Sequence, residues 1–146
     1  MSGFDWRAEG SKRPWWMNGM FAFCLYMTFI YMPFDLFWKS VESDDEVWFG
    51  VLVHGWAAKV TEPLHWAIYA GGAYGFWKMR SWMWPWAALY CGQIAVGMLV
   101  WNLRDPRGAG LAGGAVTAAV FVMLTVALWR ARSLFQPRAG RASDGG

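Results

Sequence analysis

VWFGVLVHGWAAKVTEPLHWAIYAGGAYGFW, residues 47–77, contains both histidines of the chain. His54, Lys59, Glu62 and His65 lie within twelve residues there, between two apolar flanks. An ionisable side chain in hydrocarbon costs about 2.5–3.5 kcal/mol on insertion scales, so such groups mark candidate functional sites. The stretch therefore predicts where the specific chemistry of this chain lies.

The composition around this stretch is that of an integral membrane protein. Of 146 residues, 57% are hydrophobic, 13 are Trp and only 16% are charged, whereas soluble domains are about 25% charged. The 13 basic residues flank apolar segments and form no basic stripe, which argues against nucleic acid as a partner. Cys24 and Cys91 fall inside apolar segments without metal-ligand spacing, and we expect both to be buried thiols. The lipid bilayer is the first predicted partner.

Four apolar segments are near the length of about 20 residues that a membrane-crossing helix needs. The predicted fold is an all-α integral membrane bundle over residues 15–129. It follows an N-terminal segment, residues 1–14, and precedes an Arg-, Gly- and Ser-rich tail, residues 130–146, that we expect to be disordered. The predicted spans are residues 16–34, 61–77, 82–101 and 111–129.

Residues 47–58 are apolar but too short to cross a bilayer. We predict a short extracytoplasmic interfacial or re-entrant helix here, with Thr61 as the N-cap of the next helix and Pro63 in its first turn. A continuous helix over residues 47–77 would measure about 46 Å against a hydrocarbon core of about 30 Å. The helix must therefore break near Thr61 or project into water.

Basic residues are distributed unevenly about the predicted spans. With four spans both termini share one side, which carries nine of the 13 basic residues, and four lie on the other side. The positive-inside rule then places both termini in the cytoplasm, as in a bacterial inner membrane if the source is prokaryotic, and the acidic loop 35–46 outside.

Small residues recur every four positions in the second and fourth predicted spans. This spacing lets helix backbones approach closely in lipid, either within one chain or between subunits. The predicted helix-packing residues are Ala67, Gly71, Gly75, Gly110, Gly114 and Ala118.

Glu62 and His65 are spaced i, i+3 and share a face of a helix, as a carboxylate and an imidazole of a bundle metal site do. The alternative is that Glu62 pairs with Lys59 or stabilises the helix N-terminus. We take His54, Glu62 and His65 as candidate cofactor or metal ligands, and a haem or chlorophyll-type pigment would need only one histidine. Supporting polar groups are expected at the same end of the bundle, namely Asp35, Lys59, Asn102, Arg104 and Asp105.

No GxSxG, P-loop or HExxH pattern is present, and no complete catalytic set appears, so enzyme activity is not the leading prediction. Dense tryptophan and small-residue faces favour an accessory or structural subunit of a larger membrane complex, for example an energy-transducing or pigment-bearing one. The alternative is a small membrane enzyme, or a binder of a lipophilic ligand, metal or pigment, that uses His54, Glu62 and His65. A homo-oligomeric transporter or channel is a further alternative.

Overall fold

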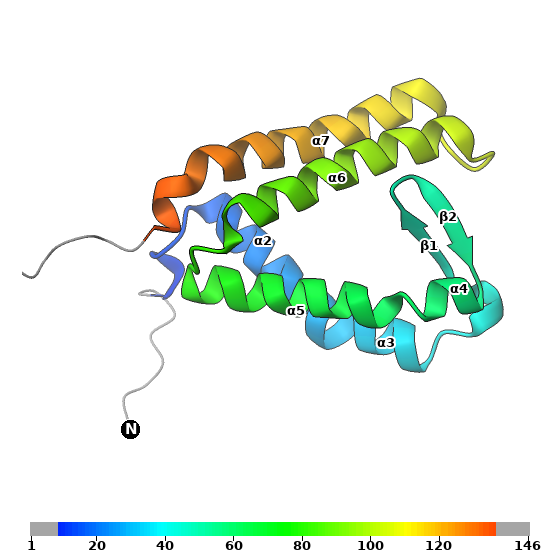
Figure 1. Cartoon of the computed structure of the whole chain (residues 1–146), viewed down its shortest axis with the longest axis horizontal. Coiled ribbons are helices and arrows are strands. Elements are labelled where there is room, and N and C mark those ends of the chain that lie inside the picture. The colour runs from blue at the N-terminus through cyan, green and yellow to red at the C-terminus, as the bar shows by residue number, and fades with distance from the viewer. Residues whose placement is uncertain (1–8, 137–146) are drawn as a thin grey trace, which may run out of the picture.

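The computed structural model describes residues 9–136, which are mostly helical. Two antiparallel helix pairs lie side by side along the long axis (Figure 1). One pair is α2, Trp15–Tyr26, with α5, Glu62–Lys78. The other pair is α6, Met83–Arg104, with α7, Gly110–Arg130.

The first predicted span is one continuous helical rod, because α2 runs through a π-helical turn, η1 (Met27–Tyr31), into α3 (Met32–Phe37). A π turn releases one backbone carbonyl from its usual partner. The carbonyl of Thr28 accepts a hydrogen bond of 2.8 Å from the Trp66 indole of α5. The π turn thereby joins the first helix to its neighbour.

Three helices are long and apolar enough to cross a membrane, namely Trp15–Phe37, Met83–Arg104 and Gly110–Leu134. Their outward surfaces are strongly apolar, with Phe29 72% and Val116 70% exposed, as suits side chains that face lipid. These three helices confirm the first, third and fourth predicted spans as long apolar helices. The 17-residue α5 is not one of the three.

The predicted helix over residues 47–58 is wrong. The chain there forms an antiparallel hairpin of β1, Asp45–Trp48, and β2, Val51–His54, followed by a four-residue helix, α4, Trp56–Lys59. Phe49 and Gly50 both have positive φ, 50° and 83°, which is the geometry of a two-residue hairpin turn. The helix does break near Thr61, since α5 begins at Glu62.

The tip of this hairpin packs against α6. A Cβ at Gly50 would lie 2.5 Å from Val100 Cβ, and one at Gly97 would lie 3.2 Å from the Gly50 nitrogen. Both glycines are therefore needed for the close approach. The hairpin fills one end of the space between the two helix pairs (Figure 1).

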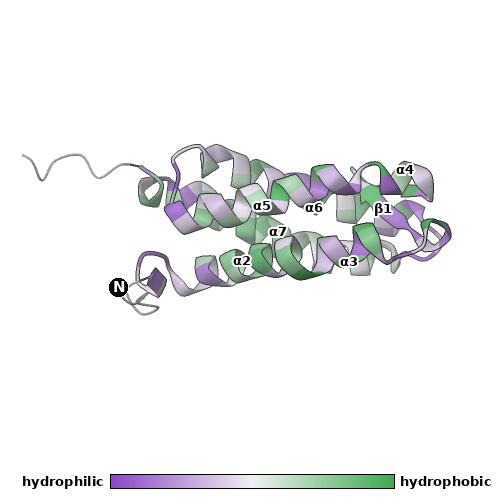
Figure 2. Cartoon of the chain, turned by 90° about the horizontal axis from the view of Figure 1, so that it is seen from below, coloured by the Kyte–Doolittle hydropathy of each residue, from purple (hydrophilic) through white to green (hydrophobic). Residues whose placement is uncertain are grey.

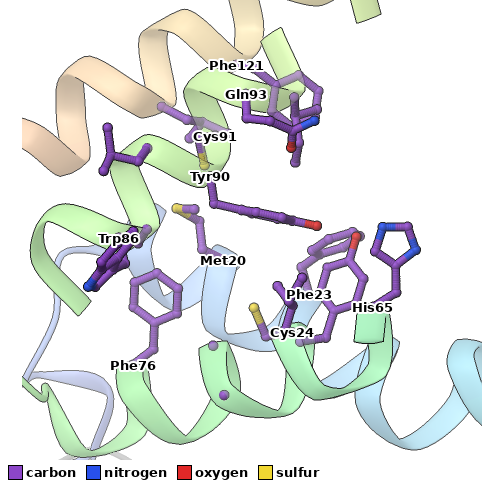
Figure 3. A pocket seen from close by; sticks show the side chains of 18 of the residues that line it. Met20, Phe23, Cys24, His65, Phe76, Trp86, Tyr90, Cys91, Gln93 and Phe121 are labelled. Atoms are coloured by element: carbon purple, nitrogen blue, oxygen red, sulfur yellow. The ribbon is translucent and has the colours of Figure 1, made fainter. Parts of the chain in front are cut away.

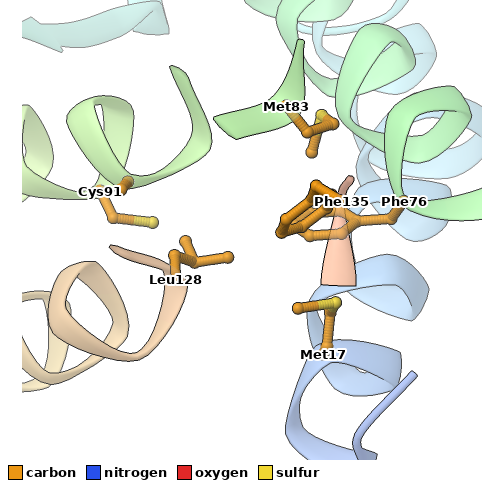
Figure 4. Close-up of a cluster of buried hydrophobic side chains, with 7 residues drawn as sticks. Met17, Phe76, Met83, Cys91, Leu128 and Phe135 are labelled. Atoms are coloured by element: carbon orange, nitrogen blue, oxygen red, sulfur yellow. The ribbon is translucent and has the colours of Figure 1, made fainter. Parts of the chain in front are cut away.

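A buried apolar cluster closes the opposite end (Figure 4). It includes Met17 of α2, Phe76 of α5 and Phe135, which follows the 3₁₀ turn η3, Ala131–Leu134. The prediction that the tail is disordered from residue 130 is therefore wrong for residues 130–136, because Phe135 is buried in this cluster. Residues 1–8 and 137–146 lie outside the described part of the chain.

The predicted packing residues differ in their surroundings. A Cβ at Gly75 would lie 2.2 Å from Met83 Sδ, and one at Gly114 would lie 3.0 Å from Asn102 Cβ. At Gly71 it would approach only the Trp82 ring, at 4.0 Å, and at Gly110 it would meet nothing within 4 Å. Ala67 is exposed and Ala118 half-buried, so among these six residues only Gly114 lies close to the backbone of another helix, whereas Gly75 makes room for the Met83 side chain.

Candidate functional site

Five charged residues meet beneath the hairpin, at the end of the bundle where Figure 2 shows hydrophilic residues gathered. Three are carboxylates at most 1% exposed. The five residues come from the end of α3 and the segment that follows it, the segment before β1, α4 and the first turn of α5. We call this group the buried charge cluster: Asp35, Lys39, Asp44, Lys59 and Glu62.

The two lysines of the cluster bridge its three carboxylates. Lys39 Nζ lies 2.9 Å from Asp35 Oδ1 and 2.8 Å from Asp44 Oδ1. Lys59 Nζ lies 3.4 Å from Asp44 Oδ2 and 3.2 Å from Glu62 Oε1. Lys59 also donates to the backbone carbonyls of Asp35 and Lys39, which ties α4 to the end of α3.

The cluster has one more carboxylate than ammonium groups. Burial acts to raise the pKa of Asp44, but contacts with Glu62, Lys39 and Lys59 outweigh it and hold that pKa below its usual value. Among the described residues, Asp35 Oδ2 and Glu62 Oε2 accept no hydrogen bond. One bound proton would balance the charge of the cluster, since buried charges are stable only when they are paired.

The three carboxylates also each place a ligand atom within 4.8 Å of the others, a spacing that a metal ion accepts. Hard cations such as Mg²⁺ or Ca²⁺ prefer such oxygen ligands. In this cluster, however, the ammonium groups of Lys39 and Lys59 already contact the carboxylates. The cluster is therefore better described as a salt-bridge network than as a metal centre.

His65 lies one helical turn from Glu62 but faces the hairpin. Its Nδ1 lies 2.9 Å from Glu46 Oε2 of β1, and its ring stacks on Trp48 with centroids 4.1 Å apart and planes 7° apart. The Trp48 indole in turn donates a 2.9 Å hydrogen bond to Thr61. These contacts fix both the position and the plane of the imidazole.

His54 lies at the outer end of β2, where it pairs with Asp45 of β1. Arg107 binds the same Asp45 at 2.8 Å and also Asp105, so the α6–α7 loop is linked to the hairpin. The contacts with Arg107 and His54 lower the pKa of Asp45. This outer network is solvent-exposed, which makes it a structural link of modest energy.

Asn102, near the end of α6, is buried and organises the same loop. Its amide donates to the Met98 carbonyl at 2.8 Å, and its side-chain oxygen accepts a 3.0 Å hydrogen bond from the Ala109 backbone. Arg104 is the exposed last residue of α6.

A half-open cavity of about 1200 Å³ lies between the two helix pairs. Its walls are almost entirely apolar and come from α2, α5, α6, α7 and the hairpin. Glu46, Trp48 and His65 line it at the hairpin end. Figure 3 shows Tyr90 of α6 reaching across the cavity with its hydroxyl toward His65, and Gln93 lies nearby.

The candidate residues are thus divided among three places. Asp35, Lys59 and Glu62 join in the buried charge cluster, His65 lines the cavity, and His54 lies in the exposed outer network. The structure does not bring His54, Glu62 and His65 together as one ligand set. Glu62 pairs with Lys59, which is the alternative to a metal site given in the sequence analysis.

Sequence reasoning missed Lys39 and Asp44 of the cluster and the partners of His65, Glu46 and Trp48. The sequence predicts a solvated loop for the acidic run before residue 47, whereas the β-hairpin turns Asp44 and Glu46 inward and leaves Asp45 in the outer network. The available signal was the run of β-branched and aromatic residues on either side of Gly50, namely Val47, Trp48, Val51 and Val53. No family model, curated protein or solved structure matches this chain.

Proposed function

We propose that this protein binds a lipophilic molecule inside the bilayer, in the cavity between its two helix pairs. The observation that carries the proposal is the cavity itself, about 1200 Å³ of apolar space with the Glu46–His65 pair at one end. Binding sites for small molecules are typically apolar clefts of about 300–1000 Å³ with a few convergent polar groups. An acyl or isoprenoid chain fits a volume of this size.

The surrounding contacts suit a fixed binding site. The apolar cluster with Phe76 and Phe135 closes one end, and the hairpin, anchored by Gly50 against α6, closes the other. Beneath the hairpin, the buried charge cluster supports the segments that precede and follow it. The polar end of the cavity is therefore held in one geometry, which reduces the entropic cost of binding.

Filling the cavity should abolish binding. Gly71 lines the cavity and a Cβ there meets no atom closer than 4.0 Å, so Gly71→Phe places a phenyl ring in the ligand space. We expect the lipophile that co-purifies with the protein to fall at least tenfold, which corresponds to about 1.4 kcal/mol. The measurement is organic extraction of protein purified in mild detergent, followed by mass spectrometry.

The matched control is Val116→Phe, which adds a ring to the outer surface of α7, where Val116 is 70% exposed. This variant should retain the lipophile at the level of the parent. A Gly71→Phe protein that is folded and still carries the parental amount of lipophile would refute binding in this cavity.

We also propose that α5 crosses the membrane as a fourth span, about 25 Å long at 1.5 Å per residue. The support is topological: α2 and α3 end beside the hairpin, whereas α6 begins at the opposite end (Figure 1). The chain must return across the same distance between them. With four spans the basic residues favour cytoplasmic termini, a hairpin outside, and integration into an inner-membrane-type bilayer.

Cysteine labelling tests this topology. In a background without Cys24 and Cys91, a single cysteine at Ser43 should react with an impermeant thiol reagent on intact cells, and one at Ser133 should not. Both serines are exposed, so burial would not protect either cysteine. Labelling at Ser133 alone would reverse the orientation, and labelling at both would remove α5 as a span.

The prediction of an accessory subunit in a larger membrane complex remains a second proposal, supported by the predicted packing residues Ala67 and Gly110, which no close contact within the described part of this chain covers. Native mass measurement of the same purified material distinguishes a subunit of a larger complex from a protein that binds a lipophile without partner chains. Partner chains would support the subunit, a bare defined oligomer would support a transporter or channel, and visible absorption would identify the lipophile as a haem or pigment.

A further inference from the structure

The hydrogen-bonding state of His65 determines what head group the cavity accepts. Glu46 Oε2 lies 2.9 Å from His65 Nδ1, and an ionised carboxylate only accepts hydrogen bonds. Nδ1 therefore carries the proton, and in the neutral imidazole Nε2 is left with a lone pair. A carboxylate behind a metal-binding histidine selects the tautomer in the same way.

The contacts of His65 fix the ring and therefore the direction in which that lone pair points. Stacking on Trp48 fixes the ring plane, and the side chains of His65 and Glu46 are only 13% and 14% exposed. Because His65 lines an otherwise apolar cavity, a ligand that donates a hydrogen bond to Nε2 gains affinity over one that does not. The Tyr90 hydroxyl, which lies beside the same space in Figure 3, already has the Tyr69 hydroxyl as its hydrogen-bond partner.

The charge of the cavity restricts the head group further. Among the described residues that line it, none is Lys or Arg, and its carboxylate, Glu46, is paired with His65. A phosphate or carboxylate head group would have to leave water without a cation to pair with, which is strongly unfavourable. The lining thus favours a neutral donor over an anion.

We propose that the ligand is an uncharged lipophile with a hydroxyl head group, an alcohol or a phenol, that donates a hydrogen bond to Nε2 of His65 while its apolar body fills the cavity. This inference rests on the proposed lipophile binding and adds the chemistry of the head group. It makes His65 a ligand-binding residue and Glu46 and Trp48 the residues that position it.

Three probes with one tail separate the contributions of the head group. Radiolabelled para-dodecylphenol is bound to the purified full chain, and unlabelled para-dodecylphenol, its methyl ether and para-dodecylbenzoate compete for it. The ether keeps size and apolar surface but cannot donate, and the benzoate is an anion. We expect the ether and the benzoate each to compete at least tenfold more weakly than the phenol.

His65→Phe removes the acceptor and keeps an aromatic ring on Trp48, so in this variant the phenol and the ether should compete equally. The control is His54→Phe, because His54 belongs to the exposed outer network and does not line the cavity. It should keep the parental preference. Size-exclusion chromatography verifies that each variant is folded before the comparison.

The outcomes separate this inference from the proposed function. Equal competition by phenol and ether in the parent, a phenol preference that survives in His65→Phe, or stronger competition by the benzoate would each overturn the hydroxyl head group and leave lipophile binding in place. If the parent shows no phenol binding that unlabelled phenol displaces, and Gly71→Phe gives the same signal as the parent, both the hydroxyl head group and lipophile binding in this cavity are overturned.

Discussion

Lys59→Met should destabilise the protein by about 3–5 kcal/mol, the range found when one partner of a buried ion pair is removed. Lys59 is 12% exposed in its side chain and contacts two carboxylates of the buried charge cluster. Methionine has similar length but no charge, so Lys39 alone would face three buried carboxylates. Thermal unfolding in mild detergent, followed by size-exclusion chromatography, measures the loss.

The matched control is Lys78→Met, since Lys78 is exposed at the end of α5 and should tolerate the change to within about 0.5 kcal/mol. The double variant Lys59→Met with Glu62→Gln should recover much of the loss, because it removes a carboxylate that Lys59 had paired. Equal unfolding temperatures for Lys59→Met and Lys78→Met would show that the cluster does not depend on Lys59.

The Lys59→Met defect should also depend on pH. A buried carboxylate without its ammonium partner has a raised pKa in the folded state, so the folded protein binds protons more readily than the unfolded chain. Stability of the variant relative to the parent should therefore rise as the pH falls below neutral. In the parent, the lowered pKa of Asp44 acts in the opposite direction, and its contribution is lost as the solution is acidified.

Arg13→Met should have a comparable effect at the other end of the molecule. The Arg13 side chain is 1% exposed, and its guanidinium donates to the Phe76 and Trp77 carbonyls at 2.9 and 3.3 Å, near the C-terminus of α5. It also pairs with Glu9 at 3.1 Å and binds Asn18 at 2.8 Å. Methionine would leave the buried Glu9 carboxylate and the helix carbonyls without this donor, at a cost of about 3–5 kcal/mol.

Lys12→Met is the control for Arg13, because Lys12 pairs with the same Glu9 from a side chain that is 53% exposed. An exposed pair contributes about 0–1 kcal/mol. Thermal unfolding in one detergent should thus place Lys12→Met close to the parent and Arg13→Met well below it. Similar unfolding temperatures for the two variants would show that the contacts of Arg13 do not stabilise the packing of the N-terminal segment on α5.

The long apolar helices and their approximate limits could be predicted from the amino-acid sequence alone. Composition and segment length decide these features, because only a helix satisfies every backbone group inside lipid. The ionisable residues of 54–65 were also recognised as the unusual region. Their spacing along the chain allowed the local pair of Lys59 and Glu62 to be predicted as one alternative.

How those residues are divided among the buried charge cluster, the cavity and the outer network depends on the tertiary fold. A hairpin forms over residues 45–54 because two positive φ angles reverse the chain at Phe49 and Gly50, a choice that apolar composition does not distinguish from a helix. That reversal brings Glu46 to His65 and Asp44 to the lysines, and it places His54 at the outer rim. The contact between the hairpin and α6 closes one end of the cavity. This contact joins Gly50 and Gly97, which are 47 positions apart, so the local sequence pattern does not predict it.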